Sequence, residues 1–135
     1  MHPVSYNITS FFTQKLGNKP SEYEDALSRN DKLNKFTVVD GATESIYAKR
    51  WADLLAKLFT ESNLSLFSVK NIEPKVVHVI TESLLISAQK EWREWQKTNW
   101  DSFDWGTKSA LRERGACAAF LGIELAKDES NNCLN

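Results

Sequence analysis

Apolar side chains recur at three- and four-residue intervals in two long segments of the chain. Between positions 43 and 61 they fall at Tyr47, Trp51, Leu54, Leu55, Leu58 and Phe59, and between positions 74 and 97 they fall at Val77, Ile80, Leu84, Ala88, Trp92 and Trp95. This spacing puts each set on one face of an α-helix. The second helix, at ~24 residues and 1.5 Å per residue, would be roughly 36 Å long. We therefore expect it to lie across a sheet.

Three other segments are rich in β-branched, aromatic or small apolar residues, and this composition favours strands. They are residues 4–16, residues 36–39 and residues 116–125. The run at 36–39 ends at Asp40-Gly41, which indicates a buried strand followed by a sharp change of direction. A polar connection containing Gly17 and Pro20, and then a turn-prone segment at 29–35, separate the first two strands.

The carboxyl-terminal third completes the predicted order of elements. Residues 105–114 predict a short helix that ends at Gly115, and residues 126–135 form a polar tail. The order strand, strand, long helix, long helix, strand predicts one α+β domain over residues 1–135, with mostly antiparallel sheet layers covered by helices. Three strands are few for two long helices to cover, so the sheet is expected to be incomplete. Its uncovered apolar faces should promote self-association.

Composition and charge then narrow the classes of function. Hydrophobic residues make up 41% of the chain and charged residues 26%, as in ordinary globular proteins. The net charge is −1, which provides no basic surface for nucleic acid or for an anionic membrane. The sequence has no signal-peptide pattern and no run of about 18 apolar residues, so we expect a cytoplasmic protein.

Three acidic residues have the positions expected of a site. Glu24 and Asp25 lie on the polar connection, and Asp40 ends a predicted strand. Mg²⁺ and Mn²⁺ prefer several oxygen ligands, including carboxylates and backbone carbonyls, and Gly41 would let its carbonyl turn toward an ion that Asp40 also reaches. On spacing alone, an ordinary solvated turn explains the Asp-Gly pair better than a metal site.

Other conspicuous residues favour structural roles. Four tryptophans lie close together in the sequence, at Trp92, Trp95, Trp100 and Trp105. Packing in the core or in a lid explains them better than an exposed recognition surface. His78 has no second His or Cys at ligand spacing, so we expect a packed histidine. Cys117 lies in an apolar run without a basic neighbour, and we expect an inert core thiol.

Four motifs follow one another in a specific order between residues 15 and 126. They are Glu24-Asp25-Ala26, the run 36–45 (FTVVDGATES), the helical run 51–55 (WADLL) and the run 115–123 (GACAAFLGI). Together they resemble bacterial members of the type 2C (PPM) metal-dependent protein serine/threonine phosphatases. In that family an acidic pair, a strand ending in Asp-Gly, two helices and a glycine-containing apolar strand occur in this order. The resemblance implies an αββα sandwich.

The resemblance also implies a role for each matching residue. Asp40 matches the aspartate that bridges two Mn²⁺ or Mg²⁺ ions, Gly41 the glycine whose carbonyl helps bind one of them, and Glu24 a carboxylate on that same ion. Asp25 matches a neighbour that orders metal-bound water. The implied reaction is attack of metal-activated water on the phosphorus of a phosphoserine or phosphothreonine in a protein substrate.

The chain departs from the family pattern at three places. Pro20 stands where the family has its phosphate-binding arginine, so Lys19 is the nearest cation and would bind phosphate as a point charge. Residues 42–45 are Ala-Thr-Glu-Ser where many members have His-Gly-Gly. The family's domain is roughly twice as long, and its carboxyl half supplies two further metal-binding aspartates.

These departures lead to two expectations about function. As a truncated domain, the chain is either inactive alone or works by pairing with another copy of itself or with a complementing chain that completes the two-ion site. Alternatively, it is a non-catalytic module that retains the phosphatase scaffold for binding or regulation.

Overall fold

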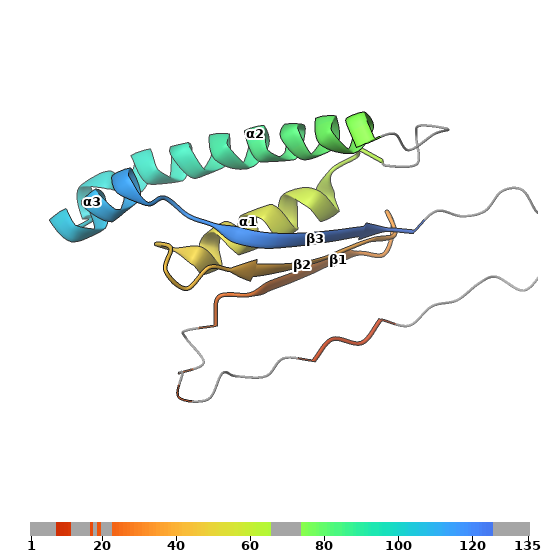
Figure 1. Ribbon diagram of the computed structural model, residues 1–135, viewed down its shortest axis with the longest axis horizontal. Helices are drawn as coiled ribbons and strands as arrows, with labels where there is room; N and C mark the ends of the chain where they lie inside the picture. The colour runs from red at the N-terminus through yellow and green to blue at the C-terminus, as the bar shows by residue number, and fades with distance from the viewer. Residues whose placement is uncertain (1–7, 12–16, 18, 20–22, 66–73, 126–135) are drawn as a thin grey trace, which may run out of the picture.

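The computed structural model describes residues 8–11, 17, 19, 23–65 and 74–125. Their elements, in chain order, are β1 (Ala26–Asn30), β2 (Lys35–Gly41), α1 (Ala48–Glu61), α2 (Pro74–Asn99), the 3₁₀ helix η3 (Trp100–Ser102), α3 (Trp105–Glu113) and β3 (Ala118–Glu124). The two long helices lie on one face of a three-stranded antiparallel sheet (Figure 1). The predicted α+β class with an antiparallel sheet is confirmed.

β1 and β2 form a hairpin. The register pairs Ala26 with Val39 and Asn30 with Lys35, so the turn covers residues 31–34 and is shorter than the predicted 29–35. The sequence pattern did not predict β1 and indicated a first strand at residues 4–16. Of residues 4–16, only 8–11 lie among the described residues, and these four have no strand structure. β1 was missed because it is short and carries small and polar residues, which have low strand propensity.

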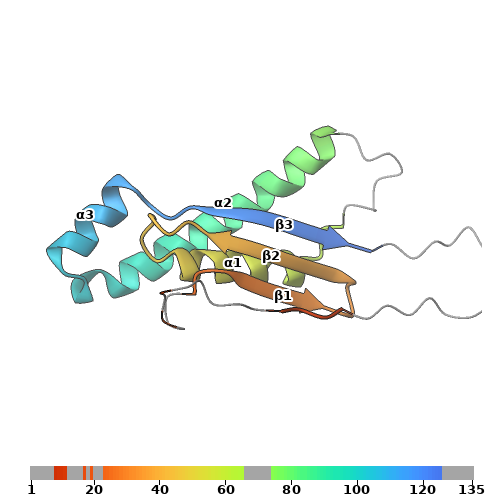
Figure 2. The same cartoon turned by 60° about the horizontal axis from the view of Figure 1, so that its bottom comes forward.

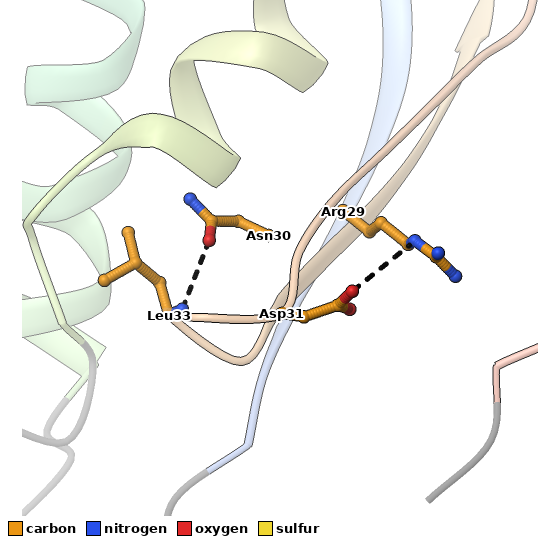
Figure 3. A network of polar contacts seen from close by, with 4 residues as sticks. All are labelled: Arg29, Asn30, Asp31 and Leu33. Carbon is orange, nitrogen blue, oxygen red and sulfur yellow. Dashed lines mark hydrogen bonds and ion pairs between the residues drawn. The ribbon is translucent and has the colours of Figure 1, made fainter.

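Local hydrogen bonds close the hairpin turn (Figure 3). The Leu33 N–H donates to both the side-chain oxygen and the backbone oxygen of Asn30, at 3.2 Å each. Asn34 has a positive φ of 51°, which asparagine tolerates better than most residues. The Arg29–Asp31 ion pair across the turn spans 3.8 Å between exposed side chains, so it adds little stability.

β2 is the central strand, and β3 pairs with its other edge (Figure 2). The antiparallel register runs from Lys35 opposite Glu124 to Gly41 opposite Ala118. The predicted strands at 36–39 and 116–125 are therefore confirmed, with slightly different ends. The Thr37 hydroxyl donates to the Leu121 carbonyl at 2.8 Å, which adds a side-chain link to this pairing.

α1 covers one face of the sheet. Val39 of β2 and Ala52 of α1 are completely buried in the core between them. At the far end of α1, the Thr60 hydroxyl lies 2.8 Å from the Ser28 hydroxyl, and its backbone carbonyl accepts a hydrogen bond from the Asn30 amide at 3.0 Å. The helix predicted over 43–61 begins only at Ala48, because residues 42–47 form turns.

α2 packs mainly on α1 (Figure 1). Ala88 and Trp92 of α2 are buried, and the Trp92 ring meets the Trp51 ring edge-on at 5.4 Å. The helix itself is confirmed with the predicted start at Pro74. It lies on the same side of the sheet as α1, and α1 presents the apolar surface on which it packs.

The predictions for single residues have mixed outcomes. Trp92 is buried and Trp95 and Trp100 are half-buried, as packing residues should be, whereas Trp105 is 83% exposed. His78 is exposed on α2. Cys117 is exposed just before β3 begins. The packed histidine and the core thiol were therefore wrong predictions.

The short helix α3 confirms the prediction over 105–114. The Asp104 carboxylate caps its first turn by accepting a hydrogen bond from the Thr107 N–H at 2.7 Å, and Gly115 follows its end with a φ of 66°. The polar tail at 126–135 lies outside the described residues. Within the described part of the chain, no helix has the length and apolarity needed to cross a membrane.

Candidate functional site

The β1–β2 hairpin brings the acidic residues of the predicted site together. Ala26 lies opposite Val39, and continuing this antiparallel register places Asp25 opposite Asp40 and Glu24 opposite Gly41. The backbone supports this continuation, because a Cβ atom added to Gly41 would lie only 2.6 Å from the Glu24 carbonyl oxygen. Residues that are about fifteen positions apart in the sequence therefore become neighbours.

Gly41 is required for this close approach. The same added Cβ would lie 3.1 Å from the Ala48 Cβ in the first turn of α1, so the Glu24 backbone and the helix confine the position from two sides. Gly41 does not have a positive φ, since the positive φ values in the described part of the chain occur at other residues. The close approach of its neighbours, and not its backbone conformation, is therefore what requires a glycine. The amino-terminal end of α1 approaches the backbone of β2 at Gly41.

Asp40 projects from the face of the sheet that α1 does not cover. Its neighbour Val39 is buried against α1, and successive side chains on a strand point to opposite faces. Asp40 is exposed, and on the same outer face Val38 is 51% and Leu121 is 59% exposed. The carboxylate thus lies at the end of an exposed apolar strip.

Tyr23 is a member of the site that sequence reasoning missed. Its hydroxyl forms a hydrogen bond with Asp25, and its pKa is raised above 10.0 by burial, by Asp25 and by Asp40. Tyr23 therefore stays a neutral hydrogen-bond donor near both carboxylates. A usable signal was its position two residues before Asp25, because residues at that spacing share a face in extended chain.

The loop after Gly41 is fixed at both ends. The Ala42 N–H donates to the Cys117 carbonyl at 3.0 Å, and the Ser45 hydroxyl donates to the Ala42 carbonyl at 2.8 Å. Tyr47, which ends the loop, packs edge-on against the Trp95 ring at 5.0 Å. The half-buried tryptophans therefore help hold the loop that connects Asp40 to α1.

A groove of about 520 Å³ follows the outer face of the sheet. It is lined mainly by apolar side chains, among them Leu27, Phe36, Val38, Leu121 and Ile123, and residues 8–11 form another part of its wall. Tyr23 also lines it. The groove and the acidic end of the hairpin consequently meet at this tyrosine.

The carboxylates present fit one hydrated cation better than the implied two-ion centre. Among the residues described, no group of three or more His, Cys, Asp or Glu side chains lies close enough to hold a metal ion. Mg²⁺ often uses only one or two carboxylates and keeps several waters. Asp40, Asp25 and the Gly41 carbonyl would match that smaller requirement.

Lys19 lies on the exposed part of the connection before Tyr23. Residues 18 and 20, on either side of it, lie outside the described residues. Its role in phosphate binding stays a prediction.

The opposite end of β2 carries a second charged group, Lys35, which is 2% exposed. Its ammonium donates hydrogen bonds of 2.5 Å to the carbonyls of Ser62 and Leu64, just beyond α1. Burial lowers the Lys35 pKa, and the Glu124 carboxylate opposes that shift. Lys35 thus satisfies carbonyls near the negative end of the α1 dipole, as a helix-capping cation does.

Comparison with known proteins neither supports nor contradicts the resemblance to type 2C phosphatases. No protein-family model, curated protein or solved structure matches this chain.

Proposed function

We propose that this chain is a metal-dependent phosphatase domain of the type 2C kind, which hydrolyses phosphoserine or phosphothreonine in a protein substrate. The observation that carries the proposal is the tight contact between Gly41 and the Glu24 backbone, at 2.6 Å for an added Cβ. It supports a site in which the acidic pair and the Asp-Gly motif act together.

The residues around this contact suit distinct tasks. Asp40 is exposed at the strand end and would hold a Mn²⁺ or Mg²⁺ ion together with the Gly41 carbonyl. Such a cation neutralises phosphate charge and lowers the pKa of water when bound. Asp25 is oriented by its hydrogen bond with Tyr23, which suits a carboxylate that orders a water. Tyr23 keeps its proton and remains a donor.

The outer groove supports a protein substrate. Its apolar lining and its length along the sheet suit an extended peptide segment, and its Tyr23 end lies beside the carboxylates. A phosphorylated side chain bound at that end would lie near Asp40 and Asp25, where a bound cation would neutralise its charge. Lys19 would add a point charge for the phosphate.

Hydrolysis of a generic aryl phosphate tests the proposal. The purified chain should show Mn²⁺-dependent hydrolysis, and Asp40→Asn should reduce it by at least about tenfold because a ligand carboxylate is lost. Asp31→Asn is the matched control, since Asp31 is an exposed aspartate in the turn at the other end of the hairpin. Equal loss in both variants, or activity that does not need a divalent cation, would contradict the proposal.

Nuclear magnetic resonance tests the metal site separately from activity. Mn²⁺ is paramagnetic and broadens signals of nearby nuclei, so the amide signals of Asp25, Asp40 and Gly41 should broaden first on titration. Asp40→Asn should abolish this selectivity, whereas Asp31→Asn should preserve it. Broadening centred elsewhere on the chain would remove these residues from the metal site.

The absence of a third ligand side chain among the described residues favours one alternative function. A non-catalytic module would bind a phosphoprotein on the same groove without hydrolysing it. Selective Mn²⁺ broadening without hydrolysis, together with calorimetric binding of a phosphoserine peptide, would support this binding module over the enzyme.

A further inference from the structure

Among the described residues, β3 is an edge strand of the sheet. In the described part of the chain it pairs with β2 on one side only. Its sequence, AAFLGIE over Ala118–Glu124, contains neither lysine nor proline, the residues that commonly protect an edge from pairing with another chain. At seven residues, it is also longer than the opposite edge strand β1, which has five and includes Arg29.

The hydrogen bonds to β2 determine which residues of β3 face the open edge. The Ala42 N–H donates to the Cys117 carbonyl, and the Leu125 N–H donates to the Asn34 carbonyl. In an antiparallel pair, hydrogen-bonded residues alternate along the strand, so odd-numbered residues of β3 bond to β2. Ala118, Phe120, Gly122 and Glu124 therefore direct their backbone N–H and C=O groups toward the edge.

The adjacent part of α2 is also uncovered. The stripe that buries Ala88 and Trp92 continues toward the amino terminus through Leu84, Leu85 and Val77, where Leu85 and Val77 reach 41% exposure. Figure 2 shows this half of α2 extending past β3. The open edge of β3 and this half of α2, which carries the exposed apolar residues, thus lie on the same side of the molecule.

We propose that a second copy of this chain docks here, through antiparallel pairing of β3 with β3 around a two-fold axis at Leu121. This register pairs all seven strand residues and uses the edge-facing groups of both copies. It places Phe120 beside the partner's Gly122, a favourable pairing of an aromatic ring with an edge glycine, and Glu124 beside the partner's Ala118. No like charges oppose each other along the strand, and the inference does not depend on the proposed catalytic activity.

The available surface is sufficient for a dimer. A seven-residue strand is about 23 Å long, and a sheet edge with a helix layer beside it is roughly 20 Å deep, so each copy offers on the order of 500 Å². The total of about 1,000 Å² reaches the lower limit for a specific interface and exceeds most crystal contacts. A dissociation constant in the micromolar range is expected at this size.

Sedimentation equilibrium of the full chain tests the dimer. The wild type should have twice the monomer mass of 15.4 kDa at concentrations well above the micromolar range. Leu121→Lys should yield monomers, because it places two ammonium groups opposite each other at the axis. Leu27→Lys is the matched control on the same outer face but on β1, and it should leave the dimer intact. A monomeric wild type, or a dimer that only Leu27→Lys disrupts, would overturn the proposal.

The contribution of α2 is tested with a second pair of variants. Leu85→Glu places a charge on the exposed stripe and should raise the dimer dissociation constant at least about tenfold. Ile86→Glu, at a neighbouring position that is 60% exposed on another side of the helix, should leave it unchanged. Equal effects of the two variants would exclude the stripe from the interface.

A disulfide tests the register. In a Cys117→Ser, Cys133→Ser background, Leu121→Cys should form a disulfide-linked dimer on mild oxidation, because directly opposed residues of a non-hydrogen-bonded pair are about 4.5 Å apart at Cα. Ile123→Cys should not, since this register separates its two copies by roughly 13 Å. Preferential cross-linking at 123 would overturn the register.

Discussion

The two ends of β2 differ in the burial of their charged residues. At one end, Lys35 is almost completely buried, and two backbone carbonyls accept hydrogen bonds from its ammonium group. At the other end, Asp40 is exposed, and continuing the hairpin register places another carboxylate, Asp25, opposite it.

This difference in burial indicates different roles: the charge of Lys35 is structural, whereas the charge of Asp40 is available to a ligand. Lys35 joins the end of α1 to the sheet, so its ionic group already has its partners within the fold. The Asp40 end instead gathers negative charge where solvent can enter, and Tyr23 keeps its proton there. A bound cation would provide the carboxylates at the Asp40 end with a partner of opposite charge. At the Lys35 end, backbone carbonyls already serve as partners.

The largest expected effect is at the buried end. Lys35→Met keeps most of the side-chain volume but leaves the Ser62 and Leu64 carbonyls without their donor, and it should reduce the free energy of unfolding by about 3 kcal/mol. Urea denaturation measures the loss. Lys32→Met, at an exposed position in the turn, should change stability by less than about 0.5 kcal/mol. Similar losses in the two variants would refute a special role for Lys35.

A smaller loss is expected at Gly41. Gly41→Ala brings a Cβ against the Glu24 backbone, which cannot move aside as a side chain can, and should cost about 2 kcal/mol. Gly122→Ala is the comparison, because its Cβ would meet the Phe59 ring at 2.7 Å and a ring can rotate away. Thermal unfolding should rank Gly41→Ala as the more harmful change; the reverse ranking would show that the Gly41 contact is not rigid.

Asp40→Asn should act in the opposite direction to Lys35→Met. Without divalent cations, removing one of two facing carboxylates should stabilise the chain by roughly 0.5 kcal/mol. With saturating Mn²⁺ the wild type should become the more stable protein, since the ligand binds the folded state. Urea unfolding with and without Mn²⁺ measures both signs. Destabilisation in metal-free buffer would show that Asp40 already has a structural partner.

The smallest expected effect is on the titration of Tyr23. A raised tyrosine pKa means that the folded state keeps the proton longer, so the chain loses stability as the pH rises from the ordinary value of 10.0 through the raised one. Asp25→Asn should lower the Tyr23 pKa and narrow this interval. Burial, the largest cause, should still keep the pKa above 10.0.

Ultraviolet difference spectra of tyrosinate measure this pKa, with Tyr23→Phe as the reference for the other tyrosines. An unchanged Tyr23 pKa in Asp25→Asn would argue against the hydrogen bond between the two residues.

Sequence patterns predicted the long elements and the residues of the acidic end, and failed where long-range contacts decide the structure. The apolar stripes and the Asp-Gly break located both long helices and β2. β1 was missed because its stability comes from pairing with β2 and from hydrogen bonds to Thr60. The buried position of Lys35 could not be predicted from the sequence either. A lysine in a turn-prone segment is expected to be solvated, and the carbonyls that bind Lys35 lie far along the chain, near residue 62.

The Thr37–Leu121 hydrogen bond joins residues 84 positions apart, and this separation has a consequence for folding kinetics. β1, β2 and α1 are consecutive and make mostly local contacts, so their assembly closes only short loops. β3 pairs with β2 only after the chain that contains α2 and α3 has closed into a long loop. Closing this loop costs more chain entropy than closing the short loops between β1, β2 and α1. The hairpin with α1 should therefore form first during refolding, and amide protons of β3 should acquire protection from exchange last.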